Sequence, residues 1–138
     1  MLLVAALAVG VSACSRGQAA DEETGYRDAK VEAVKGTDLS RVTLSQQAAD
    51  RLGIQTAQVR AGPAGRTIIP YAAVLYDETG DTWTFTSPQP LTYLRHQIEV
   101  DLIQGNRALL SAGPPVGTTV VTVGAAELLG TELGVGEE

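Results

Sequence analysis

The sequence contains few of the side chains on which disulfide formation, metal binding and most enzymatic chemistry depend. Its 138 residues include one cysteine (Cys14), one histidine (His96) and one methionine (Met1). A single cysteine cannot form a disulfide within the chain, and a zinc site needs three or four nitrogen, sulfur or oxygen ligands. We therefore expect no disulfide, no bound metal and no cofactor.

Positive charge and aromatic side chains are also scarce. Ten Lys and Arg residues stand against sixteen Asp and Glu, a formal charge of −6, and the basic residues do not cluster. A nucleic-acid partner would require a basic patch, so we expect no nucleic-acid binding. Aromatic residues make up 4% of the chain, and the core must therefore be built mainly from Val, Leu, Ile and Ala.

The N-terminal apolar run ends at Cys14. A membrane-spanning helix needs about 20 apolar residues, so residues 1–13 are too few, but their length matches the apolar core of a secretory signal. Residues 11–14, Val-Ser-Ala-Cys, resemble the bacterial lipobox, in which an aliphatic residue and two small residues precede a cysteine. The resemblance implies that residues 1–13 are a lipoprotein-type signal peptide and that Cys14 carries the lipid.

This resemblance places the mature protein outside the cytoplasm as a membrane-anchored lipoprotein, in the periplasm or on the outer face of the cell membrane. The lipid bilayer is then a partner through acylated Cys14. Signal peptides usually carry Lys or Arg before the apolar run, but none precedes Leu2, which leaves the true translation start open. The other interpretation of Cys14 is a buried or incidental cysteine.

Composition divides the rest of the chain into three parts. Residues 14–40 are polar and lack strand or helix periodicity, so we predict a flexible tether there. Residues 41–133 carry short β-like runs with turn signals every eight to twelve residues, a spacing typical of a small β-barrel or sandwich. Residues 134–138 are expected to be a loose tail.

Local signals within residues 41–133 predict individual elements. Ser45 can cap a short helix over residues 46–52, and Gly53 can end it. Residues 73–86 predict a β-hairpin in which Gly80 supplies a positive φ in the loop. Residues 124–130 predict about one helical turn. The expected fold is mainly β, a small antiparallel β-barrel or sandwich with one short N-terminal helix.

Alternation along the chain also predicts which side chains face the core. In the hairpin, Trp83 and Phe85 alternate with threonines, so both aromatic rings should share one face. The following strand is expected to bury only one face. We expect the side chains of Leu94, Ile98, Val100 and Leu102 to point inward, and those of Tyr93, Arg95, Gln97, Glu99 and Asp101 to point outward.

Three stretches resemble one family of proteins. Residues 42–57 (VTLSQQAADRLGIQTA) are similar to the first of them, and residues 69–85, with IPYAAVLY and TWTF, to the second. The third lies within residues 98–125, as IEV, LLSAG and GTTVVTVGA. Together they resemble the membrane-proximal domain of the periplasmic adaptors, or membrane fusion proteins, of RND-type efflux pumps. The resemblance implies an RND-type permease as a partner and a β-rich domain without enzymatic activity.

The chain departs from this family in the middle. Full adaptors carry a lipoyl-like domain, a long helical hairpin and a β-barrel between the first two stretches, where this chain has only residues 61–65. No heptad pattern for a coiled-coil hairpin is present. Because both ends of a full adaptor contribute strands to its membrane-proximal domain, a short loop could join the two cut ends. We therefore expect a membrane-proximal domain on its own, attached to a lipid anchor.

Few residues stand out as candidate sites. Tyr71, beside Pro70, and Trp83 are possible partner contacts because aromatic residues dominate interface hot spots. Trp83, Tyr76, Phe85 and Tyr93 are alternatively the large rings of a small core. His96 is expected to be structural or at the edge of the core. The acidic residues of the hairpin loop, Asp77, Glu78 and Asp81, lack the spacing of a calcium loop and suit a turn.

Three functions from different classes remain after these exclusions. The first is a lipid-anchored, non-catalytic adaptor subunit of a transmembrane efflux system. The second is a surface lipoprotein that binds a small ligand or a cell-wall glycan through the same β fold. The third, an enzyme, is disfavoured because no nucleophile–base pair is visible, and it would depend on His96.

Overall fold

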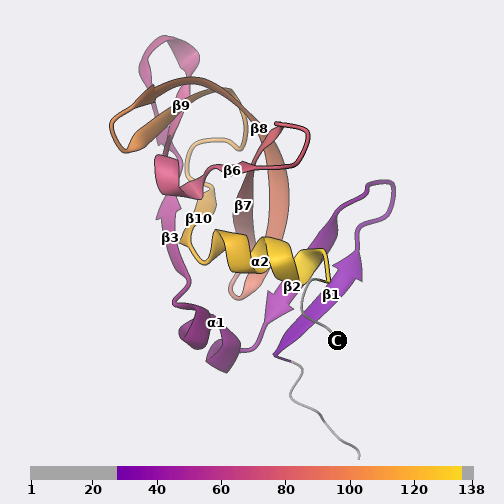
Figure 1. Cartoon of the computed structure of the whole chain (residues 1–138). Coiled ribbons are helices and arrows are strands. Elements are labelled where there is room, and N and C mark those ends of the chain that lie inside the picture. Colours follow the sequence, from indigo (N-terminus) through magenta and orange to yellow (C-terminus); the bar gives the residue numbers. More distant parts are fainter. Residues whose placement is uncertain (1–27, 135–138) are drawn as a thin grey trace, which may run out of the picture.

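The computed structural model describes residues 28–134 as an antiparallel β-sheet with two α-helices (Figure 1). The predicted signal peptide, Cys14 and residues 135–138 lie outside this range. The strands are β1 (Ala29–Ala33), β2 (Ser40–Leu44), β3 (Gln55–Gln58), β4 (Arg60–Ala61), β5 (Thr67–Pro70), β6 (Leu75–Tyr76), β7 (Thr82–Gln89), β8 (Thr92–Gln104), β9 (Arg107–Ala112) and β10 (Thr119–Val123).

The sheet is nearly closed because two consecutive strands, β3 and β4, form its two opposite edges. Strand order runs β3-β10-β7-β8-β9-β5-β4, and β3 and β4 are consecutive in sequence. The chain bends at Val59, whose N–H donates to the Thr118 carbonyl (2.9 Å) and whose carbonyl accepts from the Gly117 N–H (2.9 Å). β3 thereby pairs with β10, and β4 pairs with β5. This barrel-like sheet confirms the predicted mainly β, antiparallel fold.

β7 lies between two clusters of buried side chains, because both of its faces are covered. Phe85 is fully buried in the first cluster, and Thr84 is fully buried on the opposite face. The first cluster comprises Val42, Leu44, Ala48, Ala49, Phe85, Tyr93, Val121, Ala125 and Leu128. The second comprises Val59, Ile69, Ala73, Ile98, Ala108, Leu110 and Val120. Apart from Phe85 and Tyr93, these clusters consist of aliphatic side chains.

The helix α1 (Gln46–Leu52) forms as its end signals predict. The Ser45 hydroxyl accepts a hydrogen bond from the Ala48 N–H (3.0 Å), and Gly53 ends the helix in the left-handed region with φ 64°. A helix of two turns is unstable in isolation. Ala48 and Ala49 are buried in the first cluster, and this packing holds the helix in place.

The second helix, α2 (Ala125–Glu132), is longer than the single turn expected from the sequence. It follows Gly124, and its Ala125 and Leu128 are buried in the first cluster. Figure 1 shows α2 beside β2 and β1, and residues of α2 contact both strands. In the described part of the chain, neither helix is long and apolar enough to cross a bilayer.

Residues 29–40 correct the predicted tether over residues 14–40. β1 pairs with β2 from Ala29↔Leu44 to Ala33↔Ser40, and the Val34 N–H donates to the Leu39 carbonyl (2.9 Å) across the turn. Apolar periodicity is absent because this hairpin is stabilised mainly by backbone pairing, and most of β1 is exposed. The folded domain therefore begins near residue 29 instead of residue 41.

β8 corrects the predicted pattern of inward and outward side chains. Tyr93 is buried because it lies opposite Val42 of β2 within the first cluster. Arg95, also expected outside, has a side chain only 11% exposed. Irregular register between Glu99 and Leu102 breaks the alternation, and Leu102 is 46% exposed. Ile98 is buried as expected.

Candidate partner-binding surface

Two tyrosines are exposed close to one another on the surface. Tyr71 begins η2 (Tyr71–Ala73) and Tyr76 ends β6; their exposed fractions are 42% and 55%. The Tyr71 hydroxyl, and to a smaller extent partial burial, raises the pKa of Tyr76 above its ordinary value. We call Tyr71 and Tyr76 the tyrosine pair. Their proximity concentrates apolar ring surface and two hydroxyls on one small area.

The position of the tyrosine pair follows from backbone contacts and from the short strand β6. The Tyr71 N–H donates to the Asn106 carbonyl (2.7 Å), which fixes η2 against the β8–β9 turn. The interpretation of Tyr76 as a core residue is wrong. β6 contains two residues and, among the strands that the structure describes, pairs only with β7, so no other described strand covers its outer side.

A groove of about 230 Å³ lies where the barrel-like sheet is incompletely closed. The pairing of β4 with β5 stops at Ile68, while β3 pairs only with β10 among the described strands. β3 and the end of β5 approach one another here, but no backbone pairing joins them. We call this the seam groove; it is lined by Ala57, Gln58, Arg60, Ile68, Ile69, Pro70, Asn106 and Arg107.

The seam groove carries positive charge on an acidic protein. Arg60 and Arg107 are both exposed, and no carboxylate lines the groove. Within residues 28–134, four cations pair with carboxylates: Lys30, Arg51, Arg66 and Arg95. The four without an ion pair to another described residue are Lys35, Arg41, Arg60 and Arg107. Two of these four cations thus line one small groove.

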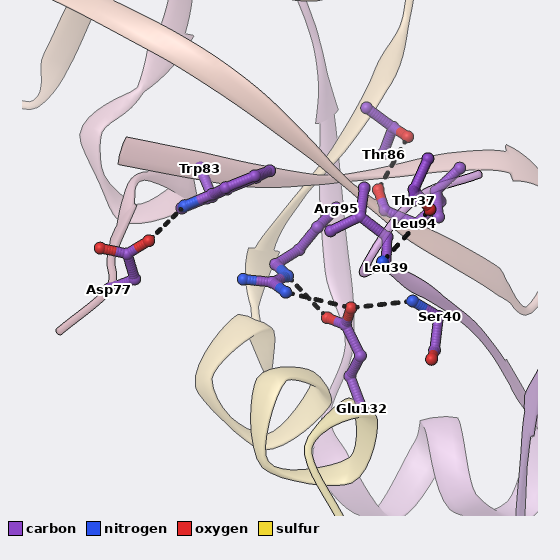
Figure 2. Close-up of polar contacts among 9 residues, drawn as sticks. All are labelled: Thr37, Leu39, Ser40, Asp77, Trp83, Thr86, Leu94, Arg95 and Glu132. Atoms are coloured by element: carbon purple, nitrogen blue, oxygen red, sulfur yellow. Dashed lines mark hydrogen bonds and ion pairs between the residues drawn. The ribbon is translucent and has the colours of Figure 1, made fainter. Parts of the chain in front are cut away.

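Trp83, the second predicted contact residue, is held by polar interactions within the fold. Its indole Nε1–H donates to the Asp77 carboxylate (2.9 Å), and the Arg95 guanidinium lies 4.7 Å from the ring centroid. Figure 2 shows Arg95 between the Trp83 ring and the Glu132 carboxylate. Trp83 is half-buried, and its indole N–H already has a hydrogen-bond partner inside the domain.

The acidic residues of the β6–β7 loop form a turn. Asp77 Oδ1 accepts from the Thr79 N–H (2.9 Å), the Thr79 hydroxyl (2.7 Å) and the Asp81 N–H (2.9 Å). These bonds, led by the Thr79 and Trp83 side chains, lower the pKa of Asp77 to about 2. The Asp77 oxygens therefore support the loop and position Trp83.

His96, the only histidine in the sequence, lies on β8. His96 follows the parity of Leu94 and Ile98, yet its side chain is exposed, with Nδ1 2.8 Å from the Gln97 carbonyl. Within residues 28–134, no group of three or more His, Cys, Asp or Glu residues is arranged to hold a metal ion.

Sequence reasoning singled out Tyr71 but missed the seam groove. Arg60 and Arg107 are far apart in sequence, and neither belongs to a basic run that could have drawn attention to them. Only the pairing of β5 with both β4 and β9 brings them to the same groove. Comparison of the chain with known proteins found no matching family model, curated protein sequence or solved structure.

Proposed function

We propose that this protein is a lipid-anchored, non-catalytic adaptor subunit of a transmembrane efflux system. Its β-rich domain contacts the extracytoplasmic face of an RND-type permease. The proposal rests on the resemblance to the membrane-proximal domain of efflux adaptors, with Cys14 as the lipid attachment point. A binding role suits a domain whose notable surface features are an exposed tyrosine pair and a groove.

One structural observation supports the proposal more than any other. The resemblance involves three separate stretches of sequence, and a membrane-proximal domain requires them to share one sheet. β2 pairs with β8, and β3 pairs with β10, so residues from the first stretch lie directly against the later strands. Without this pairing, residues 41–60 would have been detached from the hairpins and the resemblance would have lost its basis.

The tyrosine pair is the proposed contact with the permease. Its two rings are exposed, and tyrosine is enriched among interface hot spots because it buries a large ring and retains a hydrogen-bonding hydroxyl. In Figure 1, β6 and β9 lie above α2 in the view, and β1 lies to the right of α2.

Affinity purification of the full-length chain from its own membranes, at native expression, tests the contact. We expect an RND-type permease to co-purify with the wild type and to be lost with Tyr71→Ser plus Tyr76→Ser. The matched control is Val31→Ser plus Leu133→Ser, two exposed apolar residues on β1 and after α2. Recovery of the wild type without any transporter would refute the proposal.

The lipid anchor is tested separately. Cys14→Ala should move the protein from the membrane fraction to the soluble fraction, and mass spectrometry of the wild type should show an acylated N-terminal cysteine. The alternative function is that of a surface lipoprotein that binds a small ligand or a glycan. A ligand-dependent rise in melting temperature, in a protein that recovers no transporter, would favour that alternative.

A further inference from the structure

We infer that the seam groove binds an extended, acidic peptide segment of a partner protein, which adds as a strand to the free edge of β3. This inference does not depend on the partner being an efflux permease. It rests on the edge of β3, on the size of the groove and on the charge of its rim, which are independent observations.

The first observation is an unused strand edge. β3 pairs with β10 along Gln55–Gln58, and no described strand pairs with its other side. The opposite wall cannot extend the sheet to meet it, because β4–β5 pairing stops at Ile68 and Pro70 has no N–H to donate. A free edge of this kind is the feature that peptides use when they bind by strand addition.

The second observation is the shape and lining of the groove. Its volume of about 230 Å³ is smaller than the roughly 300–1,000 Å³ typical of small-molecule sites. Ala57, Ile68 and Pro70, which are half-buried, provide an apolar floor beside the β3 edge, over the buried Ile69. Because alternate side chains of a strand point to the same side, a peptide on β3 would place every second side chain over this floor. The groove therefore suits one or two apolar peptide side chains.

The third observation is charge. Arg60 and Arg107 line the groove, no carboxylate does, and neither arginine forms an ion pair with another described residue. The protein as a whole carries a formal charge of −6, so an acidic ligand should be repelled by most of its surface and attracted here. Arginine forks also recognise carboxylates with defined geometry. This complementarity favours acidic side chains on the bound peptide.

Binding of a fluorescein-labelled octapeptide of alternating Glu and Val to the full-length chain, measured by anisotropy, tests the inference. We expect the matching Lys-Val peptide to bind about tenfold more weakly or less. A Glu-Val peptide with N-methyl groups on alternate residues should lose a similar factor because it cannot complete the strand pairing. Amide chemical shifts should change at Gln55–Gln58 and at Ile69.

Substitutions in the protein provide the matched comparison. Arg60→Gln plus Arg107→Gln should weaken binding about tenfold, whereas Lys35→Gln plus Arg41→Gln, which changes the net charge equally, should change it less than about twofold. All four residues are exposed, so both variants should keep the wild-type melting temperature.

Several results would overturn the inference. They are an absence of peptide binding, equal weakening by the two double variants, or shift changes confined to other strands. A dimer in sedimentation that is lost with the Arg60 and Arg107 variant would assign the groove to a second copy of this chain. Binding to phosphatidylglycerol vesicles, lost in that variant and without peptide binding, would assign the two arginines to an anionic membrane surface.

Discussion

Arg95 on β8 and Glu132 at the end of α2 form an ion pair that joins the C-terminal helix to the sheet (Figure 2). Their side chains are 11% and 2% exposed, and Arg95 Nε lies 2.7 Å from Glu132 Oε2. That contact lacks hydrogen-bond alignment, but Arg95 Nη2 donates to Oε1 at 3.2 Å. Oε1 also accepts from the Ser40 N–H (3.1 Å), which ties in β2.

Removal of Glu132 should therefore be strongly destabilising. Glu132→Ala leaves the Arg95 guanidinium nearly buried without its partner, and we expect a loss of about 3–5 kcal/mol in the free energy of unfolding. Urea denaturation, monitored by circular dichroism, measures this free energy of unfolding. Glu127→Ala, an exposed acid in the same helix, is the control and should cost less than about 1 kcal/mol. A loss below about 1 kcal/mol for Glu132→Ala would contradict the importance of the pair.

The double variant Arg95→Met plus Glu132→Leu separates charge from packing. Replacing a buried ion pair by apolar side chains of similar volume is often neutral, since neither charge then has to be desolvated. We expect the double variant to recover most of the stability lost in Glu132→Ala. If the double variant instead loses as much stability as the single variants Arg95→Met and Glu132→Leu added together, packing around each side chain matters more than the ion pair.

The Asp77 carboxylate should make the free energy of unfolding depend on pH over a defined acidic range. Its pKa is lowered from 3.8 to about 2 in the folded protein. A carboxyl with a lower pKa in the folded state stabilises that state above its unfolded pKa, and the effect is lost as pH falls through the folded value. The stability difference between wild type and Asp77→Asn should be complete above about pH 5, fall as pH decreases towards 2, and vanish below the folded pKa of about 2.

Trp83 provides the measurement for Asp77. It is the single tryptophan, and its Nε1–H donates to Asp77, so its fluorescence should titrate with a midpoint near pH 2 before global unfolding. Glu78→Gln, in the same loop, is the control and should keep this transition. A fluorescence transition that persists unchanged in Asp77→Asn would exclude Asp77 as its source.

Gly53 and Gly124 offer a comparison of backbone strain with and without crowding. Both have a positive φ, 64° and 88°, but a Cβ at Gly53 would meet open space, whereas one at Gly124 would overlap the Ile54 Cδ1. Gly53→Ala should cost about 1–2 kcal/mol for the left-handed backbone alone. Gly124→Ala should cost a further amount of about 1–3 kcal/mol from overpacking.

Ile54→Val identifies the source of the additional cost at Gly124. It removes the Cδ1 that the new methyl group would displace, so adding it to Gly124→Ala should cost less than the sum of the two single changes. Thermal unfolding of the four proteins gives the coupling. Strict additivity would mean that the side chain of Ile54 simply rotates away.

Thr84 and Thr86 should respond in opposite directions when replaced by valine. The fully buried Thr84 hydroxyl has no hydrogen-bond partner in the described part of the chain, so Thr84→Val should stabilise the protein by about 1 kcal/mol. The Thr86 hydroxyl donates to the Leu94 carbonyl (3.0 Å), so Thr86→Val should destabilise it by a similar amount, about 1 kcal/mol. Chemical denaturation compares them, and a destabilising Thr84→Val would indicate a partner for that hydroxyl.

Contiguous residues were sufficient to predict the elements whose physics is local. The Ser45 cap and the Gly53 stop define α1, and the β6–β7 hairpin forms around Gly80, which has φ 90°. Each of these depends on a side chain or a backbone preference within a few residues, so the signal is complete in a short stretch of sequence. The mainly β fold followed from repeated signals of this kind.

One face of β8 was predicted to be exposed but is partly buried, because β2 and α2, which are distant in sequence, cover it. The sequence pattern predicts that Tyr93 and Arg95 face solvent. In the structure β2 pairs with β8 at Tyr93, and Glu132 of α2 forms an ion pair with Arg95. The β1–β2 hairpin was missed for the same reason, since its stability comes from pairing with a partner strand more than from its own apolar pattern.

The sequence by itself determined the mainly β character of the domain, the bounds of α1 and the β6–β7 hairpin, because those features are set by neighbouring residues. Tertiary structure alone decided which polar side chains are buried, where the sheet stays open and that Arg60 and Arg107 share one groove. These properties belong to pairs of residues distant in sequence, and such pairs are created only when the strands acquire their register.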